Sequence, residues 1–286
     1  MKALYNNRAI ATTTTISSSS AAYGYEANAN LKDTRLAKKW RATGKDLEVL
    51  VFSDTINAIP ATYCVIQSHN LTSDATVTLQ GNDSNEWAFP AFSITVPGIR
   101  VVSYLQDGSD AYILDGNNDP IWGYDYSSKR SKDNDVRIVT FAKQGFVYWR
   151  LVIADAGNPD GYVQIGNVYL GESLTLPAMD PAAQVPYKSS SIASKNATGQ
   201  LYGDKRIRIH GGTVNFPDID DALKQEMEYM FDVVDITTPF ILLVWENTLE
   251  YFPPLYCNLT KDLEYARVKD VQGVYWTVNL SFEECR

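Results

Sequence analysis

The chain has 286 residues, of which 45% are hydrophobic, 12% aromatic and 21% charged, and its formal net charge is −9. This length allows one large or two ordinary domains, and the many tyrosines favour strands. The acidic balance argues against nucleic acid as a partner, because phosphate contacts need a basic face. No apolar run approaches the roughly 18 to 20 residues that cross a bilayer, which argues against membrane insertion.

The N-terminal segment carries no apolar core, so we expect no cleaved secretory signal there. A Thr- and Ser-rich tract at 12–20 is typical either of a linker or of an exposed edge strand. After it, residues 32–41 place an acidic turn ahead of Trp40 and Arg41, which enter an apolar run. We expect Trp40 to fill the interior of a sandwich and Arg41 to pair with an internal acid.

Strands are predicted at 46–52, 61–68, 75–80, 136–141, 146–153 and 162–170. In the third of these, Val77 and Leu79 alternate with threonines, as in a strand with one buried face. The last two flank a Gly-Asn-Pro-Asp-Gly turn, and the closing strand runs from Gly161 to Gly171. Together these strands predict an antiparallel sandwich.

A long excursion at 83–135 interrupts this sandwich and is rich in Asp, Asn, Gly and large aromatic residues. Long surface loops often carry function. An exposed aromatic ring beside polar groups could hold a sugar, but Trp and Tyr are also enriched in subunit interfaces. We favour the interface or packing role, because bare aromatics are costly. The glycan or interface candidates are Trp87, Trp122, Tyr124, Tyr126, Asn85, Asp119 and Asp125.

The segments at 32–41 and 149–171 resemble the two ends of the galactose-binding (discoidin-like) jelly roll, a fold used mainly for attachment. The resemblance implies a structural calcium near residues 28–33, with Asp33 as a ligand. The family often has Glu near the closing strand, where this chain has Asn167. Asp33 otherwise caps a turn. Arg150 matches a ligand position of sugar-binding members, but its place within a strand indicates a structural residue.

A Pro-rich segment at 176–186 predicts a boundary, since proline stiffens an extended linker. We expect the jelly roll at 1–176, a linker at 177–186 and a second β domain at 187–286. This domain should contain a helix at about 218–234, with Asp218 as its N-cap and an apolar face towards the core. Strands are expected around 207–209, at 240–245 and 255–259, in a hairpin near 269–273 and at 276–283. The overall fold class is mainly β: a jelly-roll β-sandwich plus a β-sandwich or barrel with one flanking α-helix.

The order of elements in 187–286 resembles small ring-forming domains of bacteriophage tails, related to the tail tube fold. With the jelly roll, it implies a structural virion protein of a long-tailed phage tail tip or baseplate, made in the bacterial host cytoplasm. Such a protein would form a three- or six-fold homo-oligomeric ring, dock neighbouring tail proteins and contact host-surface glycan. The alternative is a free-standing carbohydrate-binding, lectin-like adhesin.

Signatures of catalysis are missing from the sequence. Neither His69 nor His210 accompanies a nucleophile elbow, and neither zinc-ligand spacing nor a phosphate-binding loop is present. Paired carboxylates could meet in space, but two modest β domains predict no deep cleft for them. The cysteines Cys64, Cys257 and Cys285 are odd in number and are expected to be reduced and structural. We therefore expect a protein that is not an enzyme and needs no cofactor other than a possible calcium at Asp33.

Overall fold

The structure is a computed structural model. It describes residues 1–99, 136–177, 187–189, 192–195, 201–204, 208–244, 254–270 and 273–285. The chain divides into two compact units. The sandwich unit comprises Asn7–Glu172 with Trp245–Pro254, and the helix–sheet unit comprises Met1–Asn6, Ser173–Val244 and Leu255–Arg286.

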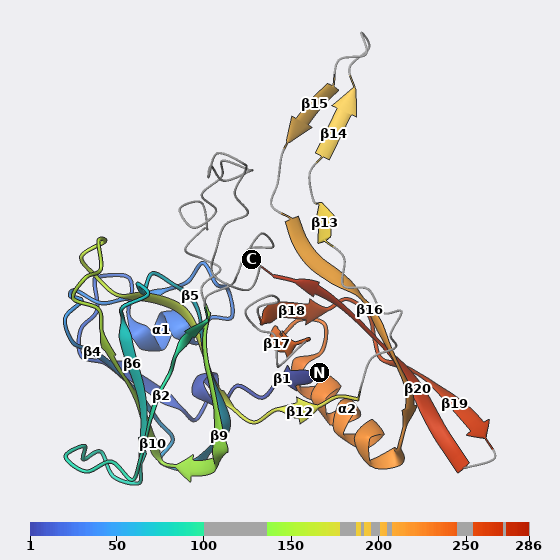
Figure 1. The fold of residues 1–286 in the computed structure, drawn as a ribbon, viewed down its shortest axis with the longest axis horizontal. Coiled ribbons are helices and arrows are strands. Elements are labelled where there is room, and N and C mark those ends of the chain that lie inside the picture. Colours follow the sequence, from blue (N-terminus) through green and yellow to red (C-terminus); the bar gives the residue numbers. More distant parts are fainter. Residues whose placement is uncertain are drawn as a thin grey trace, which may run out of the picture. The chain divides into compact units, whose positions relative to one another are not determined.

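Two five-stranded antiparallel sheets form the sandwich unit (Figure 1). The first has the order β2 (Thr15–Ser18), β4 (Glu48–Ser53), β10 (Tyr148–Ala154), β6 (Thr76–Asn82) and β7 (Phe92–Thr95). The second has the order β3 (Trp40–Arg41), β11 (Gln164–Gly171), β5 (Ile59–His69), β9 (Val136–Phe146) and β8 (Gly98–Ile99). The predicted jelly-roll sandwich is thus confirmed, and the Thr- and Ser-rich tract contains an edge strand, β2.

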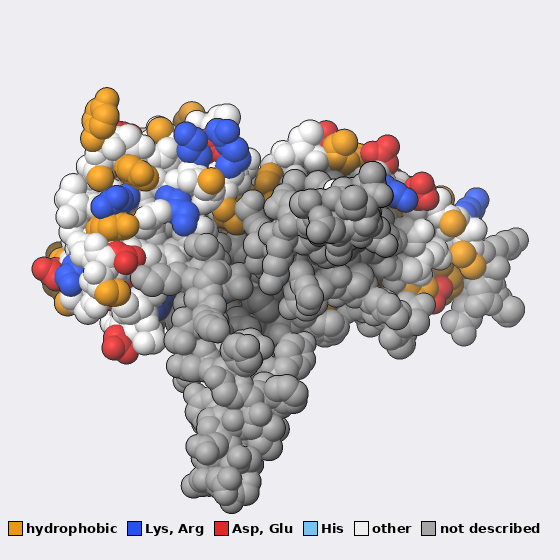
Figure 2. All heavy atoms as spheres, turned by 90° about the horizontal axis from the view of Figure 1, so that it is seen from above, with side chains coloured by type: hydrophobic (Ala, Val, Ile, Leu, Met, Phe, Trp, Pro, Cys, Tyr) orange, Lys and Arg blue, Asp and Glu red, His pale blue; other side chains and the backbone are white. Residues whose placement is uncertain are grey.

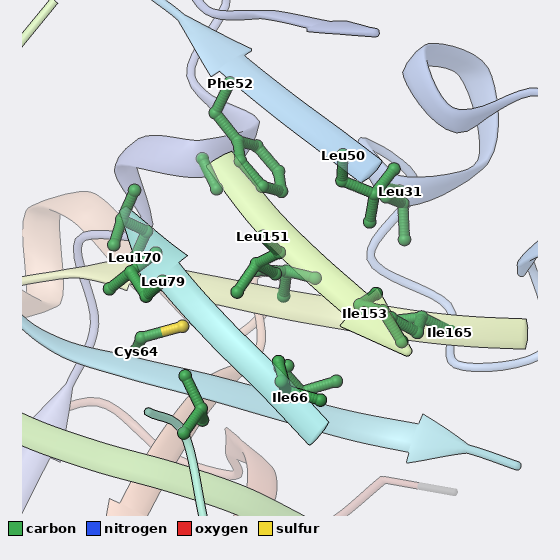
Figure 3. Packing of buried hydrophobic residues seen from close by; sticks show 14 of the residues in the cluster. Leu31, Leu50, Phe52, Cys64, Ile66, Leu79, Leu151, Ile153, Ile165 and Leu170 are labelled. Carbon is green, nitrogen blue, oxygen red and sulfur yellow. The ribbon is translucent and has the colours of Figure 1, made fainter. Parts of the chain in front are cut away.

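The core of the sandwich lies between these sheets (Figure 3). Alternate residues of each strand point into it, as Leu50 and Phe52 of β4 and Leu151 of β10 do. Trp40 is fully buried, as expected, and its indole N–H donates to the carbonyl of Ser20 at 3.0 Å. Burial of apolar surface stabilises the unit at roughly 25 cal/mol per Å².

Two short helices complete this unit. The 3-10 helix η1 (Arg8–Ile10) follows Asn7, whose side-chain oxygen accepts from the N–H of Ala9. The α-helix α1 (Ala27–Leu31) buries Leu31 in the sandwich core. These segments therefore cover apolar surface that the strands leave open.

The helix–sheet unit contains an eight-stranded antiparallel sheet. Its order is β12 (Leu174–Thr175), β1 (Lys2–Leu4), β17 (Phe240–Leu243), β18 (Leu255–Leu259), β20 (Gly273–Glu284), β16 (Arg208–Ile219) and β13 (Tyr187–Ser189), and β19 (Glu264–Asp270) also pairs with β20. β14 (Ile192–Lys195) and β15 (Leu201–Asp204) form a separate pair. Figure 1 shows β16 and β20 as long, bent strands.

The flanking helix α2 (Asp221–Val234) buries Met227, Met230 and Val234. Its N-cap is Asp220, whose carboxylate accepts from the N–H of Leu223 at 2.8 Å, so the predicted cap at Asp218 is wrong. Asp218 still belongs to β16 and has a φ of 59°. The helix begins only after the chain has left the strand. The mainly β class, with one helix flanking the second β domain, is confirmed.

Besides the assignment of Trp245–Pro254, the division into units differs at two points from the one expected from sequence. The first strand, β1, pairs with β17 and β12 and so belongs to the helix–sheet unit. That unit resumes at Ser173 rather than after the prolines. Within the described part of the chain, no helix has the length and apolar character needed to cross a membrane.

Candidate functional site

Two of the predicted glycan or interface residues, Asn85 and Trp87, lie in described parts of the chain, on the loop between β6 and β7. Trp122, Tyr124, Tyr126, Asp119 and Asp125 fall outside the described residues. The indole N–H of Trp87 donates to the side-chain oxygen of Asn85 at 2.8 Å. The loop is tied back to its strand where the Asn82 amide donates to the carbonyl of Glu86 at 2.6 Å. The structure therefore brings Asn85 and Trp87 together.

Trp87 lies against Arg150 of β10, whose guanidinium carbon is 4.4 Å from the indole centroid. Because Trp149 and Leu151 point into the core, Arg150 points to the outer face of the sheet. Its Nε donates to Oε1 of Gln80 at 2.6 Å. Partial burial lowers the pKa of Arg150. We call Gln80, Asn85, Trp87 and Arg150 the Trp87 surface.

A second cluster surrounds Arg41 at the other end of the sandwich. The guanidinium carbon of Arg41 lies 3.5 Å from the ring centroid of Tyr162 and 5.8 Å from that of Tyr25. The expected pairing with an internal acid is wrong, because Trp40 takes the inward position of β3 and Arg41 the outward one. Among the described residues, no carboxylate forms an ion pair with Arg41. We call Tyr25, Arg41 and Tyr162 the Arg41 cluster.

Asn70 holds the chain in place at Tyr162 and directly after it. Its amide donates to the carbonyl of Tyr162 at 2.8 Å, and its side-chain oxygen accepts from the N–H of Gln164 at 2.7 Å. Gln164 is also the cross-strand partner of Arg41. The ring beneath the guanidinium is therefore positioned by a hydrogen-bonded loop.

Asp33, the predicted calcium ligand, faces Arg35. Its carboxylate accepts from the Arg35 Nε at 2.9 Å, from a terminal guanidinium nitrogen and from the backbone N–H at 3.0 Å. The hydrogen bonds from Arg35 hold the pKa of Asp33 well below its usual range. In the described ranges no group of three or more His, Cys, Asp or Glu could hold a metal. Asp33 thus stabilises its turn, and the calcium site stays a prediction.

His69 lies at the end of β5 and is almost completely buried. Its Nδ1 accepts from the N–H of Leu71 at 3.2 Å. Burial, reinforced by the charge of Arg137, lowers the pKa of His69 to about 3. A neutral imidazole enclosed in this way serves packing.

Sequence reasoning missed the contacts that Gln80, Arg41, Arg150 and Tyr162 make. The alternation of β10 already indicated that Arg150 points outward, because its neighbours Trp149 and Leu151 are the apolar ones. For Arg41 and Tyr162 no local signal existed. Their contact depends on β3 pairing with β11, and the residues are far apart in sequence.

No protein-family model matches the chain, and no curated protein matches it. Solved structures do match. The chitosan-binding module 1 of a Paenibacillus sp. IK-5 chitosanase/glucanase, as a point mutant, is 16% identical to this chain, with a TM-score of 0.36. The match covers 58% of this chain and 98% of the module. The family 32 CBM of C. perfringens NanJ, in complex with galactose, has 12% identity and a TM-score of 0.36, covering 61% and 100%.

A third structure, a Ruminococcus gnavus GH29 fucosidase in complex with fucose, is 10% identical with a TM-score of 0.38. The match covers 60% of this chain. The chain spans only 28% of the length of that enzyme.

Proposed function

We propose that the chain is a glycan-binding attachment protein that holds saccharide at the Arg41 cluster. The observation that carries this proposal is a guanidinium lying on the Tyr162 ring without a carboxylate partner in the described part of the chain. A planar guanidinium offers several N–H donors in a fixed fork. Stacking fixes its orientation before a ligand arrives, which lowers the entropic cost of binding.

The surroundings of Arg41 support saccharide as the ligand. Tyr25 keeps 40% of its surface exposed and offers a ring face, while Tyr23, two residues away, is 99% exposed. Such rings can pack against the apolar side of a pyranose while Arg41 and Gln164 bond to hydroxyl or carboxylate groups. Lys38 and Lys39 precede β3, the strand of Arg41. Figure 2 shows Lys and Arg side chains beside hydrophobic ones on the sandwich unit, although the net charge of the protein is negative.

The decisive measurement is glycan-array binding by the full chain, followed by calorimetry with the strongest hit. Arg41→Ala should lower affinity about tenfold or more, since an ion pair or charge-assisted bond and a stacked group are both lost. Arg41→Lys should recover little, because an ammonium cannot reproduce the planar fork.

The matched control is Arg35→Ala, which removes the same charge from an exposed, Asp33-bound arginine in the loop that precedes β3. It should leave affinity nearly unchanged. Wild-type affinity in the Arg41→Ala variant would exclude the Arg41 cluster as the site. An array without a glycan hit would contradict the proposed function.

Tail-tip assembly is the second candidate function, favoured by the order strand, helix and several strands in the helix–sheet unit. On this proposal the chain forms a homo-oligomeric ring in the virion, docks other tail proteins, and uses its sandwich for host glycan without being an enzyme. Analytical ultracentrifugation of the full chain tests the ring, for which a three- or six-fold species is expected. Neighbouring reading frames that encode tail tube and tape-measure proteins would favour the virion role. A strictly monomeric protein would favour the free-standing adhesin.

A further inference from the structure

We infer that the Trp87 surface is a second saccharide site, for neutral sugar, which makes the sandwich unit bivalent. The inference deepens the proposed glycan-binding function and rests on it for the class of ligand. It does not depend on the Arg41 cluster being occupied, because different residues on a different sheet carry it.

The indole of Trp87 is held in one orientation from two directions. Arg150 lies 4.4 Å from its centroid, and Asn85 accepts its N–H at 2.8 Å. No other described ring or cation contacts this indole. The guanidinium thus lies on one face of the indole, and the opposite face is assigned to the ligand. A rigid aromatic plane of this kind suits the apolar side of a pyranose ring.

Polar side chains continue from the indole across the sheet in a straight row. Arg150 of β10 is the cross-strand partner of Gln80 of β6, which in turn faces Ser93 of β7. Side chains on adjacent strands are about 4.8 Å apart, so the row offers donors and acceptors at regular spacing. Of the three guanidinium nitrogens of Arg150, only Nε has a hydrogen-bond partner among the described residues. The two terminal nitrogens are therefore left for sugar hydroxyls.

The charges around this row favour a neutral ligand. Asp83 and Glu86 lie exposed on the loop that carries Trp87. They would repel a carboxylate or phosphate ligand, whereas the hydroxyl groups of a neutral sugar can hydrogen-bond to acidic and basic side chains alike. The guanidinium of Arg150 already lies on the indole and donates through Nε to Gln80, so we assign its remaining N–H donors to hydroxyl groups. The Trp87 surface therefore differs in ligand preference from the Arg41 cluster.

The two sites lie at opposite ends of opposite sheets. Trp87 follows β6 at the end where Asn82 faces Tyr148, whereas Arg41 and Gln164 lie where β5 ends and β11 begins. One sugar residue cannot contact both. Two separate sites on one rigid sandwich would raise the avidity for a polymeric or surface-bound glycan.

The test follows the Trp87 indole N–H signal by nuclear magnetic resonance in the full chain labelled with nitrogen-15. Trp87→Phe identifies that signal by removing it. The probes are galactose, fucose, N-acetylglucosamine and short oligomers of each. We expect at least one probe to shift the Trp87 signal in wild type and in Arg41→Ala alike. Trp87→Ala should then lower the affinity for that probe about tenfold or more.

Ile56→Ala, which truncates a side chain 74% exposed on another loop of the unit, is the control and should bind like wild type. Circular dichroism verifies that each variant is folded. A Trp87 signal that none of the probes moves overturns the inference, whatever occurs at Arg41. Undiminished affinity in a folded Trp87→Ala variant overturns it as well. If binding were lost in Arg41→Ala but kept in Trp87→Ala, the proposed function would stand and the second site would be excluded.

Discussion

The buried carboxylate of Asp155 accepts two hydrogen bonds from Thr72, one from its backbone N–H at 3.0 Å and one from its hydroxyl. The same carboxylate accepts from the Asn158 amide at 2.8 Å. The Asn158 amide also donates to the carbonyl of Asn70, the residue that positions Tyr162. Through Asn158 and Asn70, the hydrogen-bonded carboxylate of Asp155 thus helps to position Tyr162 of the Arg41 cluster.

Asp155→Ala should lower the free energy of unfolding of the sandwich by about 2 to 4 kcal/mol, because it removes three hydrogen bonds to the carboxylate and leaves one N–H of the buried Asn158 amide without its acceptor. Urea denaturation measures the change. Asp74→Ala, at an exposed acid on the neighbouring turn, is the control and should stay within about 0.5 kcal/mol of wild type. Equal stability of the two variants would show that the network contributes little.

Gly81→Ala should disturb the aromatic cluster at the opposite end of the sandwich. A Cβ at Gly81 would lie 2.3 Å from the ring of Phe146, which packs at 5.3 Å, centroid to centroid, against Trp149. The ring must move, so we expect a loss of about 1 to 3 kcal/mol and a weaker near-ultraviolet circular dichroism signal.

The control for this change is Gly157→Ala, where an added Cβ would meet no atom within 4 Å. Near-wild-type stability is expected there. If Gly81→Ala were as stable as Gly157→Ala, the Phe146 ring would be able to move away from the added Cβ at no cost, which would contradict its tight packing.

Much of the fold could be predicted because strands carry their pattern locally. Val77 and Leu79 alternate with threonines, and the sheet buries both of them. The pairing of β1 with β17 could not be predicted, because Lys2–Leu4 is too short for any periodicity and its partner lies near the other end of the chain. The same holds for the site: Trp87 stood out as an aromatic in a polar loop, but only the register of β10 with β6 places Arg150 and Gln80 beneath it.

The burial of His69 should make the sandwich less stable in acid. Its pKa is lowered to about 3 by burial and by Arg137, against an opposing effect of Asp155, and the ordinary value is 6.5. Below the ordinary value the unfolded chain takes up a proton that the folded chain does not. Stability therefore falls by about 1.4 kcal/mol per pH unit as pH drops from about 6.5 towards 3.

His69→Asn removes this titration and keeps an acceptor for the N–H of Leu71. The free energy of unfolding in urea is measured for wild type and for His69→Asn from about pH 7 to about pH 4. The contributions of the acids present in both proteins cancel in the difference. The stability of the variant relative to wild type should rise as pH falls. Parallel pH curves would contradict the burial of a neutral imidazole.

The cysteines allow the independence of the two units to be measured in the intact chain. Burial raises the pKa of Cys64 in the sandwich unit to about 12, and it also raises that of Cys257 in the helix–sheet unit. Thiolates are the reactive form, so neither should react with iodoacetamide in the native protein. With increasing urea, pulse labelling and mass spectrometry should show Cys64 and Cys257 becoming reactive at different concentrations, because each reports its own core.

A fragment of residues 7–172 provides the check on this expectation. It contains every strand that the structure describes in the sandwich and leaves out β1, which pairs with β17. Its Cys64 should become reactive at the same urea concentration as in the full chain. A coincident transition of Cys64 and Cys257 in the full chain, together with an unprotected Cys64 in the fragment, would show instead that the sandwich needs the helix–sheet unit in order to fold.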